Sequence, residues 1–171
     1  MSLDKHIREI KDFPRPGIGF KDITPLLLDP VAFKSSIELL HEKAKDKKID
    51  KIVAIESRGF IFGSALAHKM GIGLVPVRKK GKLPAKCISY TYSLEYGEDT
   101  LEMHEDALLK NESVLIIDDL LATGGTAEAA ASMVEKLGAK VSLIAFVIEL
   151  EFLKGKERLK KFPVISLIKY S

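Results

Sequence analysis

The chain alternates short runs of consecutive apolar residues with stretches whose apolar residues recur at helical spacing. A short apolar run between polar turns is typical of a strand that is buried on both faces, as in a parallel sheet. Such runs are Ile52–Ile55, Leu74–Val77, Val114–Ile117, Val141–Ile148 and Val164–Ile168. Helical patterns begin at Pro30 and cover Phe60–Met70, Ala127–Leu137 and Lys154–Lys161. This order predicts a single α/β domain, residues 1–171, with a parallel sheet of about five core strands flanked by helices.

The first 28 residues precede this alternation. Three apolar residues at helical spacing predict a short amphipathic helix, Leu3–Lys11. The next segment, Asp12–Phe20, holds two prolines and two glycines and is expected to be an ordered loop. Two interpretations stay open: the loop wraps over the core, anchored by Phe13 and Phe20, or it forms the rim of a pocket with Phe20 as a stacking face.

A second departure from the alternation lies at 83–105. The segments Ile88–Leu94 and Thr100–His104 have partly alternating polarity and predict an inserted β-hairpin. Because long insertions at strand ends are often lids, we expect this hairpin to cover a site.

The stretch with the most specific chemistry is Val114–Thr126. Its buried strand is followed by two carboxylates, Asp118 and Asp119, and then by the loop Ala122–Thr126. Glycines let a backbone close on a phosphate, and the first N–H groups of the following helix have no partner within the helix. Carboxylates repel phosphate, so we expect the two acids to face sugar hydroxyls or a metal. A ligand with a phosphate beside a diol suits both halves.

Two further strands end in polar turns, Glu56–Gly59 and Arg78–Lys82. The turn Arg78–Lys82 alone is most often a solvated basic turn. In an open parallel sheet, however, ligands lie at the carboxyl ends of the strands, so these turns are expected to converge on the acid-bearing loop. Together they predict a second anion site among three cations, Arg58, Arg78 and Lys82. The sequence contains no P-loop string. Gly71–Gly73 is a fragment of the dinucleotide-binding fingerprint, but it precedes a strand instead of following one. Both common nucleotide-binding motifs are therefore excluded.

Composition and net charge limit the ligands, partners and cellular compartment that we expect for this protein. A net charge of +3 is too small to indicate nucleic acid but is compatible with anionic small molecules. The single cysteine, Cys87, predicts a reducing compartment. The charged amino terminus predicts no signal peptide, and no apolar run has the length of a membrane span. We therefore expect a cytoplasmic protein with no membrane or nucleic-acid partner.

Taken together, these motifs resemble those of the type I phosphoribosyltransferases, and most closely the branch that uses adenine. The matching blocks are Phe13–Pro25, Glu56–Phe60, Arg78–Pro84, Tyr92–Gly97 and Asp118–Thr126. The resemblance implies the phosphoribosyltransferase fold, with an amino-terminal hood and a hairpin lid. It also implies transfer of the 5-phosphoribosyl group from phosphoribosyl diphosphate to adenine, giving AMP and pyrophosphate. Mg²⁺ held mainly by the substrate, with no direct protein ligand, and a homodimer in which a partner can supply a basic residue are implied as well.

The resemblance assigns roles to individual residues. The phosphoribosyl group is expected to be bound by Asp118, Asp119, Ala122, Thr123, Gly124, Gly125 and Thr126. Pyrophosphate is expected to be bound by Ser57, Arg58, Arg78 and Lys82, with a cis peptide bond before Ser57. Adenine is expected to be bound by Gly19, Phe20, Lys21 and Leu150, and the expected catalytic residues are Glu95 and Arg58. Gly19 stands where relatives usually carry a branched apolar residue, which implies a looser loop.

Two alternative functions stay open. The first is a transferase for another purine base, such as xanthine or guanine. The second is a non-catalytic regulator that binds phosphoribosyl diphosphate. A regulator of that kind needs a DNA-binding module, whereas about a dozen residues precede the Asp12–Phe20 loop, and it has no use for a complete lid with Glu95.

Overall fold

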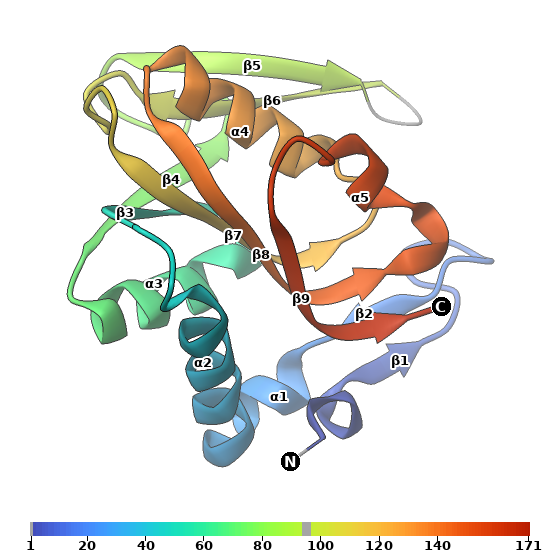
Figure 1. The fold of residues 1–171 in the computed structure, drawn as a ribbon. Helices are drawn as coiled ribbons and strands as arrows, with labels where there is room; N and C mark the ends of the chain where they lie inside the picture. The colour runs from blue at the N-terminus through green and yellow to red at the C-terminus, as the bar shows by residue number, and fades with distance from the viewer. Residues whose placement is uncertain (1, 94–96) are drawn as a thin grey trace.

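A seven-stranded sheet forms the centre of the computed structural model, which describes residues 2–93 and 97–171 (Figure 1). Its strand order is β5-β6-β4-β3-β7-β8-β9. Five neighbouring strands are parallel: β4 (Gly73–Lys79), β3 (Lys51–Ile55), β7 (Ser113–Leu121), β8 (Lys140–Leu150) and β9 (Val164–Tyr170). The predicted parallel sheet of about five core strands is thus confirmed.

Helices cover both faces of the sheet, which explains the continuous apolar runs. Alternate residues of a strand point to opposite faces. In β3, Ile52 and Ala54 pack in the cluster beneath α1 (Thr24–Leu28), α2 (Pro30–Ala44) and α3 (Arg58–Met70). Val53 and Ile55 pack in the other cluster, with α4 (Gly125–Lys136). Since each face has its own helical layer, neither set of strand residues can be polar.

The amino-terminal helix predicted for Leu3–Lys11 is wrong. The chain instead forms a 3₁₀ turn, η1 (Leu3–His6), and a short strand, β1 (Arg8–Ile10). This strand pairs antiparallel with β2 (Phe20–Asp22), and the predicted Asp12–Phe20 loop joins the two. Three apolar residues are a weak helical signal, and pairing with a distant segment overrides it.

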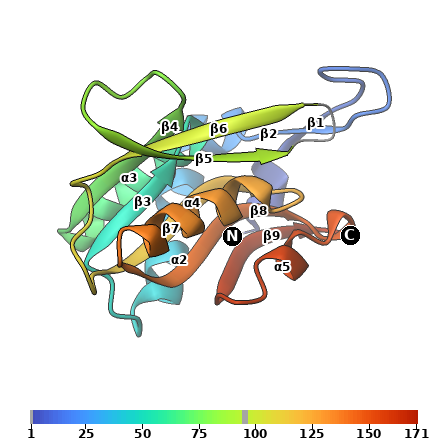
Figure 2. The same ribbon diagram turned by 90° about the horizontal axis from the view of Figure 1, so that it is seen from above.

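The predicted hairpin is confirmed as β5 (Cys87–Ser93) and β6 (Glu98–His104), which pair antiparallel along their length. It extends the main sheet, because β6 pairs with the carboxyl end of β4, where Arg78 lies opposite Glu102. On its other side, β5 packs against α4 (Figures 1 and 2). The hairpin thus reaches from the basic turn after β4 to the helix that follows the acid-bearing strand.

Two short helical elements lie between β8 and β9 in the sequence. A 3₁₀ turn, η2 (Glu151–Leu153), and the one-turn helix α5 (Gly155–Arg158) connect β8 to β9. The helix predicted for Lys154–Lys161 is therefore shorter than expected. No helix among the described residues is long and apolar enough to cross a membrane.

Candidate active site

The loop between β7 and α4 surrounds a small hollow. The hollow has a volume of about 70 Å³, and its lining consists of Asp118, Leu120–Ala127 and Phe146. Gly124 has a φ of +84°, a left-handed conformation that glycine adopts without steric cost. The helix α4 begins at the next residue, so its first N–H groups, which have no acceptor within the helix, border this loop. A cavity of this size and polarity suits a phosphate group.

The two acids lie within β7, not after it. The pairing of β7 with β8 continues past them, from Asp118 opposite Phe146 to Leu121 opposite Glu149. Rigid strand backbone therefore fixes both carboxylates. Gly59, at the start of α3, fits tightly against this strand: a Cβ there would lie 2.9 Å from the Ile117 carbonyl oxygen and 3.0 Å from Asp118 Oδ1. The turn after β3 and the acids of β7 consequently meet without a side chain between them.

The acids differ in exposure and in partners. Asp119 is buried, and its Oδ2 lies 2.8 Å from Nε of Arg58. Asp118 is partly accessible, and its Oδ1 accepts a hydrogen bond from the backbone N–H of Asp119 at 2.8 Å. Burial and the adjacent Asp119 charge raise the pKa of Asp118. Burial also raises the pKa of Asp119, although Arg58 opposes this. Two carboxylates with one cation are poorly compensated in the free protein and are suited to receive hydrogen-bond donors such as hydroxyl groups.

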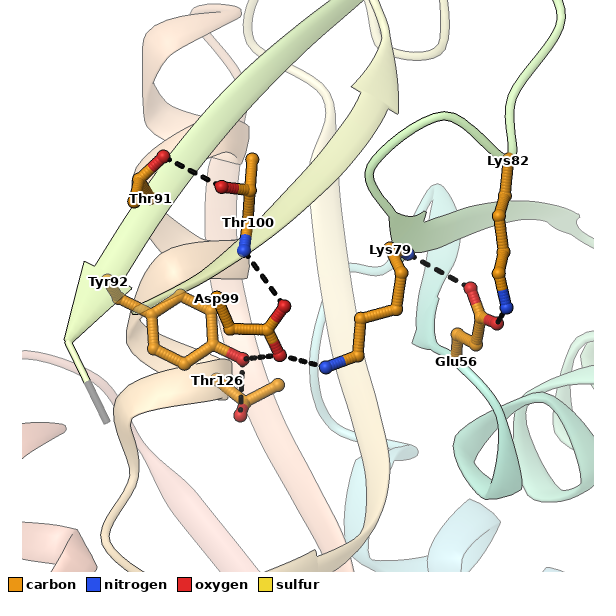
Figure 3. Close-up of polar contacts among 8 residues, drawn as sticks. All are labelled: Glu56, Lys79, Lys82, Thr91, Tyr92, Asp99, Thr100 and Thr126. Carbon is orange, nitrogen blue, oxygen red and sulfur yellow. Dashed lines mark hydrogen bonds and ion pairs between the residues drawn. The ribbon is translucent and has the colours of Figure 1, made fainter. Parts of the chain in front are cut away.

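The predicted second anion site is centred on a carboxylate that we did not assign to it. Glu56 accepts from Lys82 Nζ at 2.7 Å and from the backbone N–H of Lys79 at 3.0 Å (Figure 3). It also accepts from Arg78 Nε at 3.2 Å. Burial works against ionisation of Glu56, but these hydrogen bonds outweigh it and lower its pKa to about 2. Glu56 thus holds Arg78 and Lys82 beside each other at the carboxyl ends of β3 and β4.

Arg58 has different partners from this pair. Besides its contact with Asp119, its guanidinium carbon lies 5.0 Å from the centre of the Phe20 ring. Phe13 packs edge-on against the same ring at 5.1 Å. Arg58 therefore connects the predicted ribose acids to the predicted base-side aromatic residue. The peptide bond between Glu56 and Ser57 is cis, as expected, and Ser57 is exposed.

The remaining residues predicted on the base side come together from both ends of the chain. Lys21 points to the opposite side of β2 from Phe20: its Nζ lies 4.0 Å from the centre of the Tyr170 ring and 3.2 Å from Glu9. Tyr170 in turn pairs with Leu150, the last residue of β8. Gly19 is exposed and immediately precedes β2. The structure thus brings the β1–β2 strand pair to the carboxyl ends of β8 and β9.

Two contacts at the phosphate loop were missed by sequence reasoning. The hydroxyl of Tyr92, from the hairpin, lies 3.2 Å from that of Thr126 and 3.3 Å from Asp99 Oδ2 (Figure 3). Gly155 of α5 packs on the loop from the other side, where a Cβ would lie 2.3 Å from the carbonyl oxygen of Ala122. The signals present were weak: a tyrosine in a strand, and a glycine before a basic segment. Glu95 lies among residues 94–96, outside the described residues, so its predicted role stays a prediction.

Comparison with known proteins places this geometry in a family. Residues 25–169 match the model of the phosphoribosyl transferase domain. An adenine phosphoribosyltransferase of Solidesulfovibrio magneticus is 58% identical over 168 residues, which is 98% of each chain. The crystal structure of an adenine phosphoribosyltransferase from Thermoanaerobacter pseudethanolicus, 55% identical, superposes with a TM-score of 0.96 over 98% of each chain.

A yeast relative adds a ligand complex to these similarities. The adenine phosphoribosyltransferase of Saccharomyces cerevisiae, solved with an imino-altritol bisphosphate and adenine, is 44% identical over 96% of each chain, with a TM-score of 0.91. The family model covers most of the chain, and the relatives match it from end to end. The chain therefore belongs to the phosphoribosyltransferase family and, within it, to the adenine phosphoribosyltransferases.

Proposed function

We propose that this protein transfers the 5-phosphoribosyl group from phosphoribosyl diphosphate to adenine, giving AMP and pyrophosphate. The proposal rests on the order of three features near the carboxyl ends of the neighbouring strands β7, β3 and β4. A phosphate-sized hollow lies at the β7–α4 loop, the acid pair lies beside it, and the Arg78–Lys82 pair lies across β3. This order matches phosphate, ribose and pyrophosphate along the substrate. The relatives that match this chain from end to end are adenine phosphoribosyltransferases, and the yeast enzyme was solved with adenine.

The charges around the site suit departure of pyrophosphate. As the bond to the anomeric carbon breaks, the sugar becomes cationic and negative charge grows on the leaving group. Arg78 and Lys82 are held ready for that charge by Glu56. Asp118 and Asp119 accept hydrogen bonds from the ribose hydroxyls and, as anions beside the sugar, favour its positive charge. Ser57, exposed at the start of α3, adds a donor for pyrophosphate.

Mg²⁺ fits this site as an ion held mainly by the substrate, without a direct protein ligand. In phosphate sites Mg²⁺ is bound largely through substrate phosphates and water. Among the described residues, no group of three or more His, Cys, Asp or Glu side chains could hold a metal, and pyrophosphate oxygens would supply most of the ligands. When bound, the ion would neutralise charge on the leaving group. Two further parts of the proposal rest on the family resemblance: a homodimer, and Glu95 as the group that takes the proton from adenine.

On the base side, Phe20 offers an aromatic face and Leu150 an apolar one. Gly19 and Lys21 would contact adenine through their backbone, because the ammonium group of Lys21 is held by Tyr170 and Glu9. Backbone N–H and C=O groups can distinguish an amino group from a carbonyl on a purine, since one donates and the other accepts. The choice of adenine over guanine, xanthine and hypoxanthine rests on the relatives, which are adenine phosphoribosyltransferases.

A competition assay tests the proposed base. The protein is supplied with phosphoribosyl diphosphate, Mg²⁺ and equal concentrations of adenine, guanine, xanthine and hypoxanthine, and the nucleotides formed are separated by chromatography. We expect AMP to form first and to dominate. Faster formation of GMP, XMP or IMP would show that the base is another purine. Binding of phosphoribosyl diphosphate without formation of any nucleotide would favour the regulator.

A further inference from the structure

A chain of polar contacts joins the two anion sites through the hairpin. It runs from Thr126 on the phosphate loop to Tyr92, then to Asp99, and from Asp99 to the ammonium group of Lys79 (Figure 3). The backbone N–H of Lys79 also donates to Glu56, the residue that holds the second site. Lys79, the last residue of β4, thus directs its side chain to the hairpin.

In this series of contacts each hydroxyl group has a single hydrogen and can therefore donate to only one partner. A carboxylate can only accept, so the bond between Tyr92 and Asp99 uses the one hydroxyl hydrogen of Tyr92. The contact between Tyr92 and Thr126 then needs the hydrogen of Thr126. In this arrangement Thr126 presents lone pairs, not a hydrogen, to the loop. A phosphate at the loop, which accepts hydrogen bonds, needs the opposite.

We propose that the hydroxyl of Tyr92 competes with a ligand's phosphate for the hydroxyl hydrogen of Thr126, and that this competition couples the phosphate loop to Lys79. This inference rests on the proposed function and adds a positioning residue to it. When phosphate takes the hydrogen of Thr126, Tyr92 can keep its contact only by turning its own hydrogen to Thr126. Asp99 then loses a donor and depends more on Lys79.

The coupling also runs in the other direction, as linkage requires. An anion at the second site that draws Lys79 away leaves Tyr92 as the donor to Asp99 Oδ2. Asp99 Oδ1 keeps the backbone N–H of Thr100 at 2.9 Å. Tyr92 then keeps its hydrogen on Asp99 and continues to accept from Thr126, which opposes phosphate at the loop. Anions at the two sites therefore weaken each other through the hairpin, and a bound nucleotide phosphate favours departure of pyrophosphate.

Tyr92→Phe tests the competition, because it removes the hydroxyl but keeps the ring, which packs beside Gly125. The ligands are ribose 5-phosphate for the loop and pyrophosphate with Mg²⁺ for the second site, both measured by calorimetry. We expect Tyr92→Phe to bind ribose 5-phosphate roughly two- to tenfold more tightly than the wild type, because Thr126 no longer gives up a hydrogen bond. A purely structural role for Tyr92 predicts the opposite sign.

The second measurement is the Kd of pyrophosphate with and without saturating ribose 5-phosphate. We expect ribose 5-phosphate to raise this Kd in the wild type, and to raise it roughly two- to tenfold less in Tyr92→Phe. Asp99→Asn interrupts the same chain at the Lys79 end and is expected to reduce the coupling as well. The matched control is Thr91→Val, which removes the 2.9 Å contact between Thr91 and Thr100 on the same hairpin and should leave both quantities unchanged.

Three outcomes would overturn the inference. They are unchanged or weaker binding of ribose 5-phosphate in Tyr92→Phe, wild-type coupling in both Tyr92→Phe and Asp99→Asn, and an equal effect of Thr91→Val. The proposed function fails separately, through the absence of AMP formation by the wild-type protein. A protein that makes AMP but shows no effect of Tyr92→Phe keeps its function and loses this inference.

Discussion

At the scale of single residues, Glu56 is the clearest case of a charge set by its surroundings. Its pKa falls from the ordinary 4.5 to about 2, because hydrogen bonds from Lys82, Lys79 and Arg78 outweigh burial. A lowered carboxyl pKa stabilises the fold above the pKa of the unfolded chain, and this stabilisation is lost as the pH falls from about 4.5 to about 2. Glu56→Gln removes this titration. The free energy of unfolding should then fall less over that pH range than in the wild type, by up to about 3 kcal/mol.

Urea denaturation between pH 2 and pH 7 measures this difference. Glu105→Gln, at an exposed residue after β6, is the control and should follow the wild-type curve. Parallel curves for Glu56→Gln and the wild type would show that folding does not lower the pKa of Glu56.

The acid pair should show a conflict between stability and function. Burial and the neighbouring Asp119 raise the pKa of Asp118, so the ionised form of Asp118 destabilises the fold at neutral pH. Asp118→Asn removes the charge and keeps an oxygen for the N–H of Asp119. We expect it to increase the free energy of unfolding by about 1 kcal/mol at pH 7 while strongly reducing AMP formation.

The sign of the pH dependence provides a check. Since the folded pKa is raised, the stability cost of ionised Asp118 is absent below the unfolded pKa and grows as the pH rises. The advantage of Asp118→Asn should therefore disappear in denaturation curves below about pH 4. Asp106→Asn, at an exposed site on the loop after β6, should change neither stability nor activity. A less stable Asp118→Asn at pH 7 would contradict the electrostatic argument.

Residue chemistry predicted the candidate site only in part. The acids and the Gly/Thr loop form a continuous stretch, so their proximity was a local property of the sequence. Glu56 was not assigned because a carboxylate has no attraction for a phosphate, and its role as a holder of cations depends on two turns that meet only in the fold. Tyr92 was not assigned for the same reason, since its partner Thr126 lies 34 residues away.

At the scale of elements, pairing between distant segments decided what local patterns could not. The strand β7 runs through Asp118 and Asp119 to Leu121 because β8 continues beside it. Similarly, β1 forms because β2 returns to pair with it. Elements with helices on both sides, such as β3, were predictable, since burial on both faces leaves a clear apolar run.

The packing of α5 on the phosphate loop gives a prediction at this scale. A Cβ at Gly155 would lie 2.3 Å from the carbonyl oxygen of Ala122 and 2.8 Å from Leu121, so Gly155→Ala must displace the loop or α5. We expect a destabilisation of about 1–3 kcal/mol and a several-fold increase in KM for phosphoribosyl diphosphate. Thermal unfolding and steady-state kinetics measure the two effects.

Gly73→Ala is the matched control for this change. A Cβ at Gly73 meets only the side chain of Lys51, at 3.6 Å or more, which is ordinary contact. The control should therefore keep the wild-type KM. A wild-type KM in Gly155→Ala would show that α5 does not position the loop.

At the scale of the whole molecule, the distribution of charge bears on the proposed homodimer. Each cation of the predicted pyrophosphate site is already paired within the chain: Arg58 with Asp119, and both Arg78 and Lys82 with Glu56. Pyrophosphate carries several negative charges, so Mg²⁺ and a basic residue of a partner subunit would balance it better than these three cations alone.

A dependence of activity on protein concentration follows from this balance. We expect light scattering to give a mass of twice 18.9 kDa at micromolar concentration. If a partner completes the site, activity per chain should fall on dilution together with the dimer fraction, and the same Kd should describe both curves. Added pyrophosphate and Mg²⁺ should shift dissociation to lower protein concentration, because a ligand that bridges two subunits stabilises the dimer. A species of 18.9 kDa with full activity per chain would instead assign the whole site to one subunit, and Glu56 would then have to release Arg78 and Lys82 to the substrate without help from a second chain.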